Sequence, residues 1–368
     1  MKVLMVHARY RRPGGEDVSV ETETRALAAA GVTVQSWTLP PEAAAGPGAF
    51  LRAAWNRRAA AELVRRVRAE RPDVVHVQNF FPGLSPAVHR AAARLGLPVV
   101  QTLRNWRLVC PAATRWRAGA PCDDCIARPF AWPSLGRACW RGDRAATSAA
   151  ALALAVHRSI GTWRRVTRFV CPSRAVAAVL PETWPTAVVP NMVDPAPAPG
   201  PGGSGVVYAG RLTDEKGVGC LAEAWSRHRD LPPLEVYGEG PMASALDGVP
   251  GVTLHGRRPH AEVLDAMGRA RAVVVPSLWP EPFGRAVVEA FACGTPVVAT
   301  AAGALPELVD DGVTGLLVPG EDSHALARAV HAVTPAMRTA ARTAFERRFA
   351  APVVAPLLVE VYRSCLTP

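Results

Sequence analysis

Two glutamates eight residues apart carry the most chemical information in this sequence. Glu281 and Glu289 flank the start of a helical pattern that runs from Gly284 to Cys293, directly after the apolar run Ala272 to Pro276. That run is too short for a helix and predicts a buried strand, and Gly294 ends the helix. Because a carboxylate accepts hydrogen bonds from neighbouring hydroxyls, this arrangement suits the binding of a polyol.

The start of the same helix offers hydrogen-bond donors. The N–H groups of Phe283, Gly284 and Arg285 have no partner within the helix, and the helix dipole adds positive potential there. Such a position favours hydroxyl or phosphate oxygens, and a sugar that carries a diphosphate presents both. The plainer alternative is that the two glutamates bind nothing and only lie near a helix start, where acidic residues are common.

The composition is that of a globular protein with room for two domains. The chain has 368 residues, of which 49% are hydrophobic and 20% charged. No stretch reaches the roughly 18 apolar residues of a membrane span, and the apolar N-terminus is too short for a signal peptide. We therefore expect a cytoplasmic protein, with attachment to the inner face of the cell membrane left open.

The charge is unevenly spread along the chain. Residues 1–190 hold 27 Lys and Arg against 12 Asp and Glu, residues 191–368 hold 15 against 19, and eight of the ten Trp lie in the first half. An Arg-rich coding bias explains part of the basic charge but not its asymmetry. The first half therefore predicts an anionic partner or a membrane surface. No nucleic-acid-binding motif accompanies the charge, so we expect no nucleic acid as partner.

Short apolar strands alternate with helical patterns in the first half, which predicts a parallel sheet covered on both faces. The expected strands are Lys2 to His7, Val32 to Thr38, Val74 to Gln78, Val99 to Thr102, Phe169 to Cys171 and Ala187 to Val189. The expected helices are Glu16 to Ala30, Phe50 to Glu70, Pro86 to Leu95, Thr147 to Arg165 and Ser173 to Leu180.

A Pro- and Gly-rich stretch from Asp194 to Gly205 predicts a linker, after which the alternation restarts. The expected strands there are Val206 to Ala209, Leu234 to Tyr237, Val252 to His255, Ala272 to Val275, Val297 to Ala299 and Gly315 to Val318, with helices at Cys220 to His228, Ala261 to Arg269 and Gly284 to Cys293. Two α/β domains form a cleft, and ligands of parallel sheets bind at the carboxyl ends of the strands.

Three further loops follow strands and carry candidate phosphate-binding groups. Arg211 and Lys216 share one loop, where a planar guanidinium and a point charge suit a diphosphate, or where both pair locally with Asp214 and Glu215. Gly238 and Gly240 allow close approach of the backbone to a ligand, or form a plain turn. Gly14 and Gly15 open a helix after the first strand without the full dinucleotide fingerprint, so NAD binding is not expected.

In order and spacing, these motifs resemble those of family 4 glycosyltransferases. The shared segments are Gly14-Gly15-Glu16, Gly210-Arg211-Leu212 with Lys216-Gly217, Gly238-Glu239-Gly240-Pro241, Glu281-Pro282-Phe283-Gly284 with Glu289, and Gly294-Thr295-Pro296-Val297.

The resemblance implies an α/β chain of the GT-B fold, in which two Rossmann-like domains with parallel sheets face each other and a C-terminal helix crosses back to the first domain. It divides the chain into an acceptor domain (1–190) with a Cys-rich insert (106–144), a linker (191–205), a nucleotide-sugar domain (206–346) and a C-terminal segment (347–368). Family members are retaining enzymes that need no metal for catalysis.

The resemblance also implies residue roles. Arg211 and Lys216 would hold the diphosphate, Glu289 the ribose hydroxyls, and Glu281 the donor sugar. The remaining donor-binding candidates are Gly14, Gly15, Gly210, Gly238, Gly240, Pro282, Phe283 and Gly284.

The sequence departs from the family pattern at one place across the expected cleft. Arg104 stands where similar enzymes carry a His near the donor sugar, and Gln78 stands where a second His is frequent. Arg104 stays protonated and cannot act as a base, but it can donate to sugar hydroxyls. We therefore count Arg104 with Arg211, Lys216 and Glu281 as catalytic candidates. His76, Asn79, Asn105 and Arg107 are the acceptor-side candidates.

An insert between the fourth strand and the long helix contains four cysteines, Cys110, Cys122, Cys125 and Cys139. Their spacing, with one C-x2-C pair, predicts a structural zinc site in a reducing compartment, and free thiols or disulfides are the alternative. The four remaining cysteines are expected to be buried apolar residues.

The predicted function is retaining transfer of a sugar from a UDP- or GDP-sugar to a hydroxyl acceptor, which is a lipid-linked or anionic glycan intermediate or a small molecule. Two alternatives use the same fold. One is a non-catalytic nucleotide-sugar-binding protein, in which Arg104 marks lost chemistry. The other is a sugar phosphorylase.

Overall fold

The computed structural model describes residues 1–10, 14–40, 42, 52–194 and 202–367. It contains two compact units. The N-terminal unit consists of Met1–Arg115, Cys122–Met192 and Val354–Pro368, and the C-terminal unit of Trp116–Pro121 and Val193–Val353. The last residues of the chain thus belong with its first half, as the expected return of the C-terminal segment requires.

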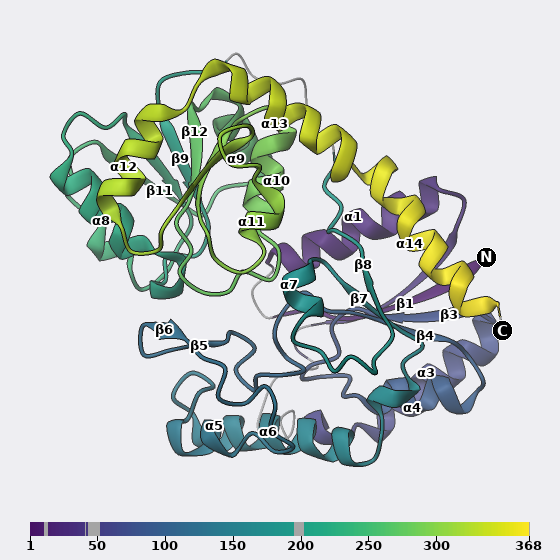
Figure 1. Cartoon of the computed structure of the whole chain (residues 1–368). Coiled ribbons are helices and arrows are strands. Elements are labelled where there is room, and N and C mark those ends of the chain that lie inside the picture. Colours follow the sequence, from purple (N-terminus) through teal and green to yellow (C-terminus); the bar gives the residue numbers. More distant parts are fainter. Residues whose placement is uncertain (11–13, 41, 43–51, 195–201, 368) are drawn as a thin grey trace. The chain divides into compact units, whose positions relative to one another are not determined.

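The sheet of the N-terminal unit has six parallel strands among the described residues, in the order β2-β1-β3-β4-β7-β8. Its strands are β1 (Lys2–Ala8), β2 (Thr33–Leu39), β3 (Val74–Val77), β4 (Val99–Thr102), β7 (Arg168–Cys171) and β8 (Thr186–Val188). Its helices are α1 (Gly15–Ala29), α3 (Arg57–Glu70), α4 (Ala87–Arg94), α5 (Trp132–Arg137), α6 (Arg144–Ser159), α7 (Arg174–Ala177) and the 3-10 turn η2 (Trp163–Arg165). Within this unit, α1 lies on one face of the sheet, and α3 and α4 lie side by side on the other (Figure 1).

The described sheet of the C-terminal unit repeats this plan with six parallel strands in the order β11-β10-β9-β12-β13-β14. Its strands are β9 (Val206–Ala209), β10 (Leu234–Tyr237), β11 (Val252–Gly256), β12 (Ala272–Val275), β13 (Val297–Thr300) and β14 (Gly315–Val318). Its helices are α8 (Val218–Arg227), α9 (His260–Arg269), α10 (Arg285–Ala292), α11 (Leu305–Leu308), α12 (Ser323–Ala332), α13 (Pro335–Arg348) and the 3-10 turns η3 (Asp214–Lys216) and η4 (Ala243–Ala245).

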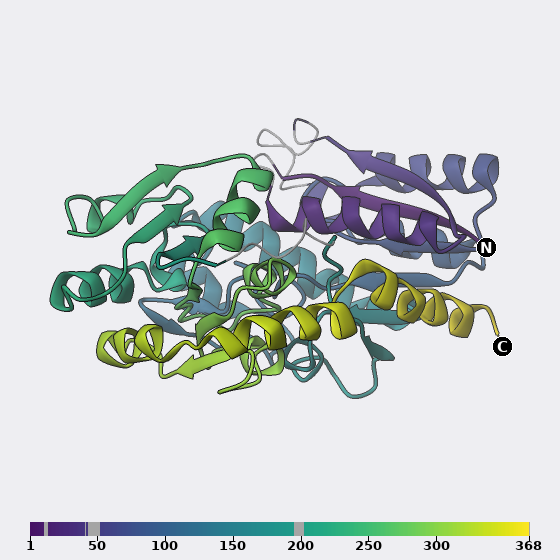
Figure 2. The same cartoon turned by 90° about the horizontal axis from the view of Figure 1, so that it is seen from above.

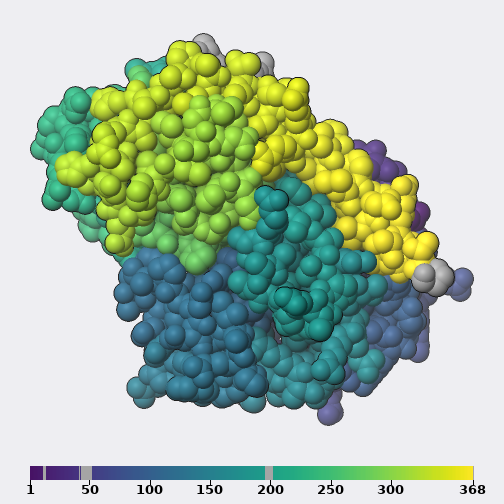
Figure 3. Space-filling view, in the orientation of Figure 1, coloured from purple at the N-terminus to yellow at the C-terminus, as the bar shows by residue number. Residues whose placement is uncertain are grey.

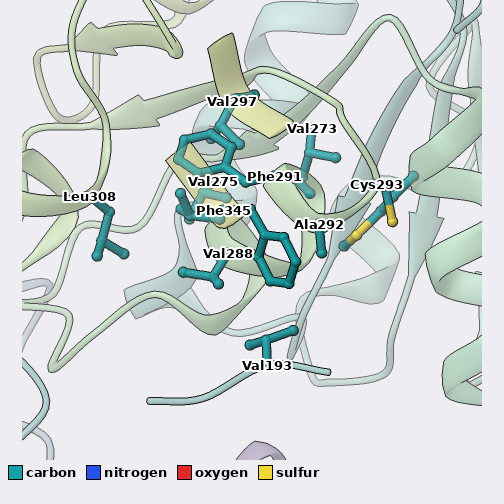
Figure 4. Packing of buried hydrophobic residues seen from close by; sticks show 14 of the residues in the cluster. Val193, Val273, Val275, Val288, Phe291, Ala292, Cys293, Val297, Leu308 and Phe345 are labelled. Carbon is teal, nitrogen blue, oxygen red and sulfur yellow. The ribbon is translucent and has the colours of Figure 1, made fainter. Parts of the chain in front are cut away.

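Both faces of this second sheet are covered by apolar layers. One layer joins Phe291 of α10 and Phe345 of α13 to Val273 and Val297 of the central strands, and Figure 4 shows these side chains packed together. The other layer lies under α8 and α12. Burial on both faces explains why these strands are continuous apolar runs rather than alternating patterns.

The last helix, α14 (Ala351–Leu366), ends the chain in the N-terminal unit. Its side facing the protein is buried, with Tyr362 fully enclosed, while the other side stays open to solvent in Figure 3. In the view from above, α14 follows α13 with only a short break (Figure 2). The pattern expected as one segment from Phe345 to Leu366 is therefore two helices, separated at Phe349 and Ala350, where Ala350 bridges to Val193.

Other helix boundaries also differ from expectation, and the helix expected from Ser173 to Leu180 is only the short α7 (Arg174–Ala177). The helix expected from Phe50 to Glu70 is interrupted, because Asn56 adopts an extended conformation and caps a new helix by accepting a hydrogen bond from Ala59. Phe50 and the next residue lie outside the described residues. The helix expected to run on to Arg165 ends at Ser159, and Gly161 follows with a φ of 68°. Of the expected linker, residues 195–201 also lie outside the described residues. None of the helices in the described ranges has the length and hydropathy of a membrane span.

Candidate functional site

The loops after β9, β10 and β12 meet at the carboxyl end of the second sheet. Backbone hydrogen bonds tie the first loop to the second, from Leu212 N to Glu239 O at 3.0 Å, and the third to the first, from Leu278 N to Glu215 O at 2.9 Å. The three donor-binding segments predicted from the sequence therefore come together in one place, as expected for a ligand site of a parallel sheet.

The glycines of the second loop are needed for this loop contact. Gly238 has a φ of 147°, and a Cβ added there would lie 1.8 Å from the carbonyl oxygen of Gly210. A Cβ on Gly240 would lie 2.1 Å from the carbonyl oxygen of Leu212. Because these residues have no side chain, one loop can rest on the other. This explanation for the two glycines differs from both expectations, a plain turn and a close approach to a ligand.

Lys216 and Glu281 form a half-enclosed ion pair at the centre of the site. The side chains are 19% and 7% exposed, and the Lys216 ammonium also lies 4.8 Å from the centre of the Trp279 ring. The hydroxyl of Ser277 donates to the same Glu281 oxygen at 2.6 Å. Burial alone would raise the pKa of Glu281, but the Lys216 ammonium and these hydrogen bonds hold it below the usual value.

Glu289 lies on the second turn of α10, where the sequence predicted it. Its Oε1 accepts from Arg285 Nε at 2.6 Å and lies 2.9 Å from His260 Nε2. Burial would raise the pKa of Glu289, but His260 and Arg285 hold it below the usual value. Because both donors use Oε1, the described residues leave Oε2 without a donor. This oxygen can accept a hydrogen bond from a ligand hydroxyl.

The remaining cation of the site stays exposed. Among the described residues, the Arg211 side chain is held only by an ion pair with Glu215 at 3.0 Å, and 58% of that side chain is accessible. The hydroxyl of Thr213 nearby in the same loop is buried without a partner in the described part of the chain. The amides of Phe283 and Gly284 likewise have no acceptor among the described residues. The site thus combines two cations with unfilled donors, which suits an oxygen-rich anion.

In the N-terminal unit, Gly14 and Gly15 are exposed at the start of α1. Gly14 N donates to Asp17 Oδ2 at 3.0 Å, and Asp17 Oδ1 lies 2.9 Å from the buried His7. Burial acts to raise the pKa of Asp17, but the bonds from His7 and Gly14 lower it overall. A Cβ on Gly14 would meet nothing within 4 Å, so the space beside this helix start is open.

Arg104 is not free to meet a ligand. Its Nη2 pairs with Glu23 Oε2 at 2.6 Å, its Nε donates to Asn191 at 3.1 Å, and its Nη1 donates to Gln78. Gln78 in turn donates to the other Glu23 oxygen at 2.5 Å. Only 5% of the Arg104 side chain is exposed. Arg104 and Gln78, the two departures from the family pattern, thus share one buried carboxylate, and a catalytic part for Arg104 stays a prediction.

His76 and Asn79 are fully engaged inside the same unit. His76 lies between Tyr362 Oη and Thr102 Oγ1, each at 2.6 Å, and burial followed by the Arg104 charge keeps its pKa well below the usual range. Asn79 donates to Ala8 O at 2.8 Å. These contacts give both residues a role in stabilising the fold. An acceptor-side role for them stays a prediction.

Asn105 lies in a half-buried polar cluster, and Arg107 beside it is buried and donates to Pro111 O. Asn105 Nδ2 lies 3.3 Å from Tyr10 Oη and 3.4 Å from Glu16 Oε1. Burial raises the pKa of Tyr10 well above its usual value, and the Glu16 charge adds to this. The Arg107 guanidinium lies between Phe81 and Trp140, at 4.5 and 4.2 Å from the ring centres. Aromatic faces beside such polar groups fit a sugar or another polar organic ligand.

The four cysteines of the insert are half-buried and form no disulfide among the described residues. Burial, and then the charges of the other three thiols, raise the pKa of Cys125 to about 11. Among the described residues, no group of three or more His, Cys, Asp or Glu side chains is placed to hold a metal ion. The structure thus gives no ligand geometry for the predicted zinc, which stays a prediction for metal analysis of the purified protein.

Two family models together cover most of the chain. The model for glycosyltransferase family 4 matches residues 13–197, half of the 368 residues. The chain belongs to glycosyltransferase family 4. The model for glycosyl transferases group 1 matches residues 203–334, which hold the paired loops and both glutamates.

Curated relatives match only in part. The glycogen synthase of Mycobacterium tuberculosis is 37% identical over 145 residues, which are 37% of this family 4 chain and 35% of that enzyme. The D-inositol 3-phosphate glycosyltransferase 1 of Catenulispora acidiphila is 49% identical over 86 residues, 23% of this chain and 20% of that enzyme. The chain thus matches about a third or less of these relatives' length.

Solved structures match over nearly the whole chain. HepE of Anabaena in complex with UDP-glucose has a TM-score of 0.66 at 18% identity, covering 99% of this chain and 100% of that one. The sucrose-phosphate synthase of Thermosynechococcus elongatus has a TM-score of 0.68 at 19% identity, covering 99% of both. At this identity the likeness shows the fold, which is the GT-B fold predicted from the motifs.

Several residues that shape the site of this family 4 member were missed in the sequence. Arg285 lies four residues before Glu289 on one helix, a spacing that predicts an ion pair. Glu23 falls between Val20 and Leu27 on the buried stripe of α1, where a carboxylate needs a partner. His260 comes from another element, and no local signal connects it to Glu289.

Proposed function

We propose that this chain is a retaining glycosyltransferase that moves a sugar from a nucleoside-diphosphate sugar to a hydroxyl acceptor. The observation that carries the proposal is the half-enclosed Lys216–Glu281 pair among loops at the carboxyl end of the second sheet. A cation and a carboxylate held together without ligand match the two ends of such a donor, its diphosphate and its sugar hydroxyls. Membership of family 4 supports the same reading.

Donor binding then becomes an exchange of partners. The diphosphate brings negative charge to Lys216 and replaces Glu281, while Arg211 closes on the phosphates from the exposed side of the loop. Released from Lys216, the Glu281 carboxylate accepts hydrogen bonds from the sugar hydroxyls. Glu289 Oε2 accepts from the ribose. Since Ser277 stays bonded to Glu281, the carboxylate keeps its place during the exchange.

The transfer step needs charge stabilisation more than proton abstraction. The bond from the anomeric carbon to the diphosphate oxygen breaks, and the acceptor oxygen bonds to that carbon on the same face. The acceptor proton passes to the leaving phosphate. Lys216, Arg211 and the amides of Phe283 and Gly284 stabilise the charge that develops on the diphosphate.

UDP is the nucleotide we propose first. The support is that HepE of Anabaena, of the same fold, was solved with UDP and with UDP-glucose. GDP is the alternative that a nucleotide panel separates, because no described contact in the chain selects the base.

For the acceptor, we place the binding groups at Asn105, Arg107, Tyr10 and Glu16 of the N-terminal unit. The cluster joins a carboxylate and a phenol to a guanidinium between two aromatic rings. A hydroxyl acceptor with an anionic group fits such a cluster, as does a lipid-linked glycan intermediate.

One observation favours a second candidate, a protein that binds the nucleotide sugar without transferring the sugar. Arg104, which replaces the usual His, is engaged by Glu23, Gln78 and Asn191 and cannot serve as a base. Donor hydrolysis separates the two candidates, because an inactive binder holds the donor without turning it over. A sugar phosphorylase would require inorganic phosphate for turnover.

The experiment is a panel of nucleotide sugars, tested by thermal shift and by slow hydrolysis on the wild-type protein and on Arg211→Ala and Arg104→His. We expect one nucleoside-diphosphate sugar to raise the melting temperature and to be hydrolysed slowly. Arg211→Ala should weaken that binding by about 1.5–3 kcal/mol, the range for a hydrogen bond to a charged group. Binding without hydrolysis of any donor, in wild type and in Arg104→His, would favour the inactive binder.

A further inference from the structure

A buried indole in the candidate donor site has a hydrogen-bond donor without an acceptor. Trp279 lies in the loop after β12, and only 8% of the residue is exposed. Its Nε1 is enclosed, and no group in the described part of the chain accepts a hydrogen bond from it. A buried donor without a partner destabilises a folded protein, so its presence in a ligand site calls for an explanation.

The backbone on both sides of this indole is held in place. The N–H of Trp279 donates to Glu215 O at 3.2 Å, and the N–H of Ala304 donates to Glu281 O at 2.9 Å. Pro280 lies between Trp279 and Glu281 and fixes φ at its own position. The loop therefore has little freedom to turn the side chains of Trp279 and Glu281 away from each other.

The two side chains meet at one cation. Lys216 Nζ is paired with a Glu281 oxygen and lies 4.8 Å from the centre of the Trp279 ring. Burial acts to raise the pKa of Glu281, but Lys216, then Ser277 and last Trp279 outweigh it and keep the pKa low. The indole N–H is thus close to the Glu281 carboxylate, although it forms no hydrogen bond with any described residue.

Donor binding, as proposed above, takes the cation out of this cluster. The Glu281 side chain is 7% exposed, and a carboxylate so enclosed is strongly destabilised when it loses its counter-ion unless another donor replaces it. Ser277 already donates to this carboxylate at 2.6 Å. Trp279 Nε1 is a nearby donor that still lacks a partner. The acceptor left by Lys216 and the unsatisfied indole can therefore satisfy each other.

We propose that Trp279 is a positioning residue of the donor site, whose indole N–H donates to the Glu281 carboxylate once Lys216 has moved to the diphosphate. In this second state the carboxylate keeps its charge and its orientation, and it accepts hydrogen bonds from the hydroxyls of the donor sugar. This role of Trp279 rests on the proposed partner exchange at Lys216, since it supplies the group that replaces the lysine.

The test measures UDP binding by titration calorimetry. Trp279→Phe keeps an aromatic face beside Lys216 and removes the N–H, so it should bind UDP on the order of 30-fold more weakly than wild type, the effect of one hydrogen bond to a charged group. The matched control is Trp225→Phe. Trp225 is another buried tryptophan of the same unit, on α8, and its N–H donates to Pro232 O at 2.8 Å. The UDP affinity of this control should stay within about twofold of wild type.

A second background separates positioning from a structural effect. In Glu281→Gln, the further change Trp279→Phe should weaken UDP binding only about fivefold, because a hydrogen bond to a neutral amide is roughly half as strong as one to a carboxylate. A loss of packing around the ring would instead lower the UDP affinity by the same factor in both backgrounds.

The indole N–H signals of tryptophan labelled with ¹⁵N give a measurement on the wild-type protein. The signal of Trp279 is the one missing from Trp279→Phe or, should that variant not fold, from Trp279→Tyr. It should move downfield when UDP is added, because a hydrogen bond to a carboxylate deshields the proton. The signal of Trp225 should stay where it is.

Three results would overturn the proposal: UDP binding to Trp279→Phe as tight as to wild type, an equal loss in the two backgrounds, or a Trp279 indole signal that UDP does not move. Each of these leaves the donor site in place, because UDP still binds wild type. If no nucleoside diphosphate binds wild type, the proposed donor site is itself wrong and the role of Trp279 falls with it.

Discussion

At the scale of single residues, the candidate donor site contains charges that neutralise one another until a ligand arrives. Lys216 is paired with Glu281, and Glu289 accepts from Arg285 and His260. Leaving any of these charges buried without a partner would cost several kcal/mol. The internal pairs therefore keep the site ordered, and a donor has to offer groups that replace them.

This exchange makes Glu281→Gln informative. Without its negative charge, residue 281 no longer competes with the diphosphate for Lys216, so UDP alone should bind at least as tightly as to wild type. The added affinity of UDP-sugar over UDP should fall by about 1.5–3 kcal/mol, because hydrogen bonds from the sugar to a carboxylate are lost. Titration calorimetry with both ligands measures the two values.

Glu289→Gln serves as the matched comparison. This change removes the acceptor proposed for the ribose, so UDP and UDP-sugar should weaken together and their difference should stay constant. If Glu281→Gln weakened the binding of UDP more than it reduced the added affinity of UDP-sugar over UDP, the partner exchange would be contradicted.

The pKa shift of Glu289 predicts a dependence of stability on pH. A carboxyl whose pKa is lower in the folded protein than its usual value of 4.5 stabilises the fold above that value, and this contribution is lost as the pH falls through the folded pKa. Glu289→Gln should therefore lower the melting temperature near neutral pH. The difference in melting temperature from wild type should shrink as the pH falls below 4.5 and through the folded pKa of Glu289. Thermal melts of both proteins over this window measure it, and a deficit independent of pH would rule out the charge as its cause.

Sequence reasoning found the groups of this site but not their partners. Glu281, Glu289 and Lys216 could be predicted from the sequence because each follows a recognisable strand at a fixed spacing. The hydrogen bonds from His260 to Glu289 and from Arg104 to Glu23 join elements far apart in the chain, and nothing in the local sequence determines which side chains will meet. Long-range polar pairing is settled only by the packing of the whole unit.

At the scale of elements, the site depends on one loop resting on another. The loop after β10 can approach the loop after β9 only because Gly238 has no side chain, its Cβ position lying 1.8 Å from a carbonyl oxygen. The glycines of this motif therefore position Arg211 and Lys216 indirectly. Loss of the loop contact should disturb the diphosphate site before it disturbs the sheet.

Gly238→Ala is accordingly expected to destabilise the protein by about 1–3 kcal/mol and to weaken UDP binding. Gly14→Ala is the control, since a Cβ there meets nothing within 4 Å and its φ of −137° suits any residue. That variant should keep the stability of wild type. Chemical denaturation with a UDP titration measures both effects, and equal stability of the two variants would refute the steric argument.

Strands were easier to predict than helices at this scale. Short apolar runs such as Val99 to Thr102 and Ala272 to Val275 are buried on both faces and coincide with β4 and β12. The helix expected from Phe50 to Glu70 was wrong as one element because Asn56 caps a new helix through contacts with Gly83 and Ser85. Those contacts come from a separate loop, which the periodicity of the helix itself does not reveal.

At the scale of the whole molecule, the chain returns to where it began. Tyr362 of α14 bonds to His76 of β3, 286 residues away, at 2.6 Å. Both groups are fully buried, and His76 is neutral because burial keeps its pKa low. This bond helps fix α14 to the N-terminal unit.

Tyr362→Phe should therefore cost about 1–3 kcal/mol, since the buried His76 Nδ1 loses its short hydrogen bond and keeps only a long contact with Gln78 Nε2 at 3.4 Å. Arg363→Gln changes the next residue on the exposed side, where a pair with Glu360 at 3.7 Å contributes little. Urea unfolding of the two variants compares them. Equal midpoints would show that the bond to His76 does not hold the helix.

The most direct test of the proposed donor site uses the two lysines of the chain, Lys2 and Lys216. A ligand that binds only the folded protein raises its melting temperature, so UDP should raise that of wild type and of Lys2→Ala by the same amount. Lys216→Ala should lose most of this increase. If no nucleoside diphosphate raises the melting temperature of wild type, or if Lys216→Ala responds as wild type does, the assignment of the donor site is wrong.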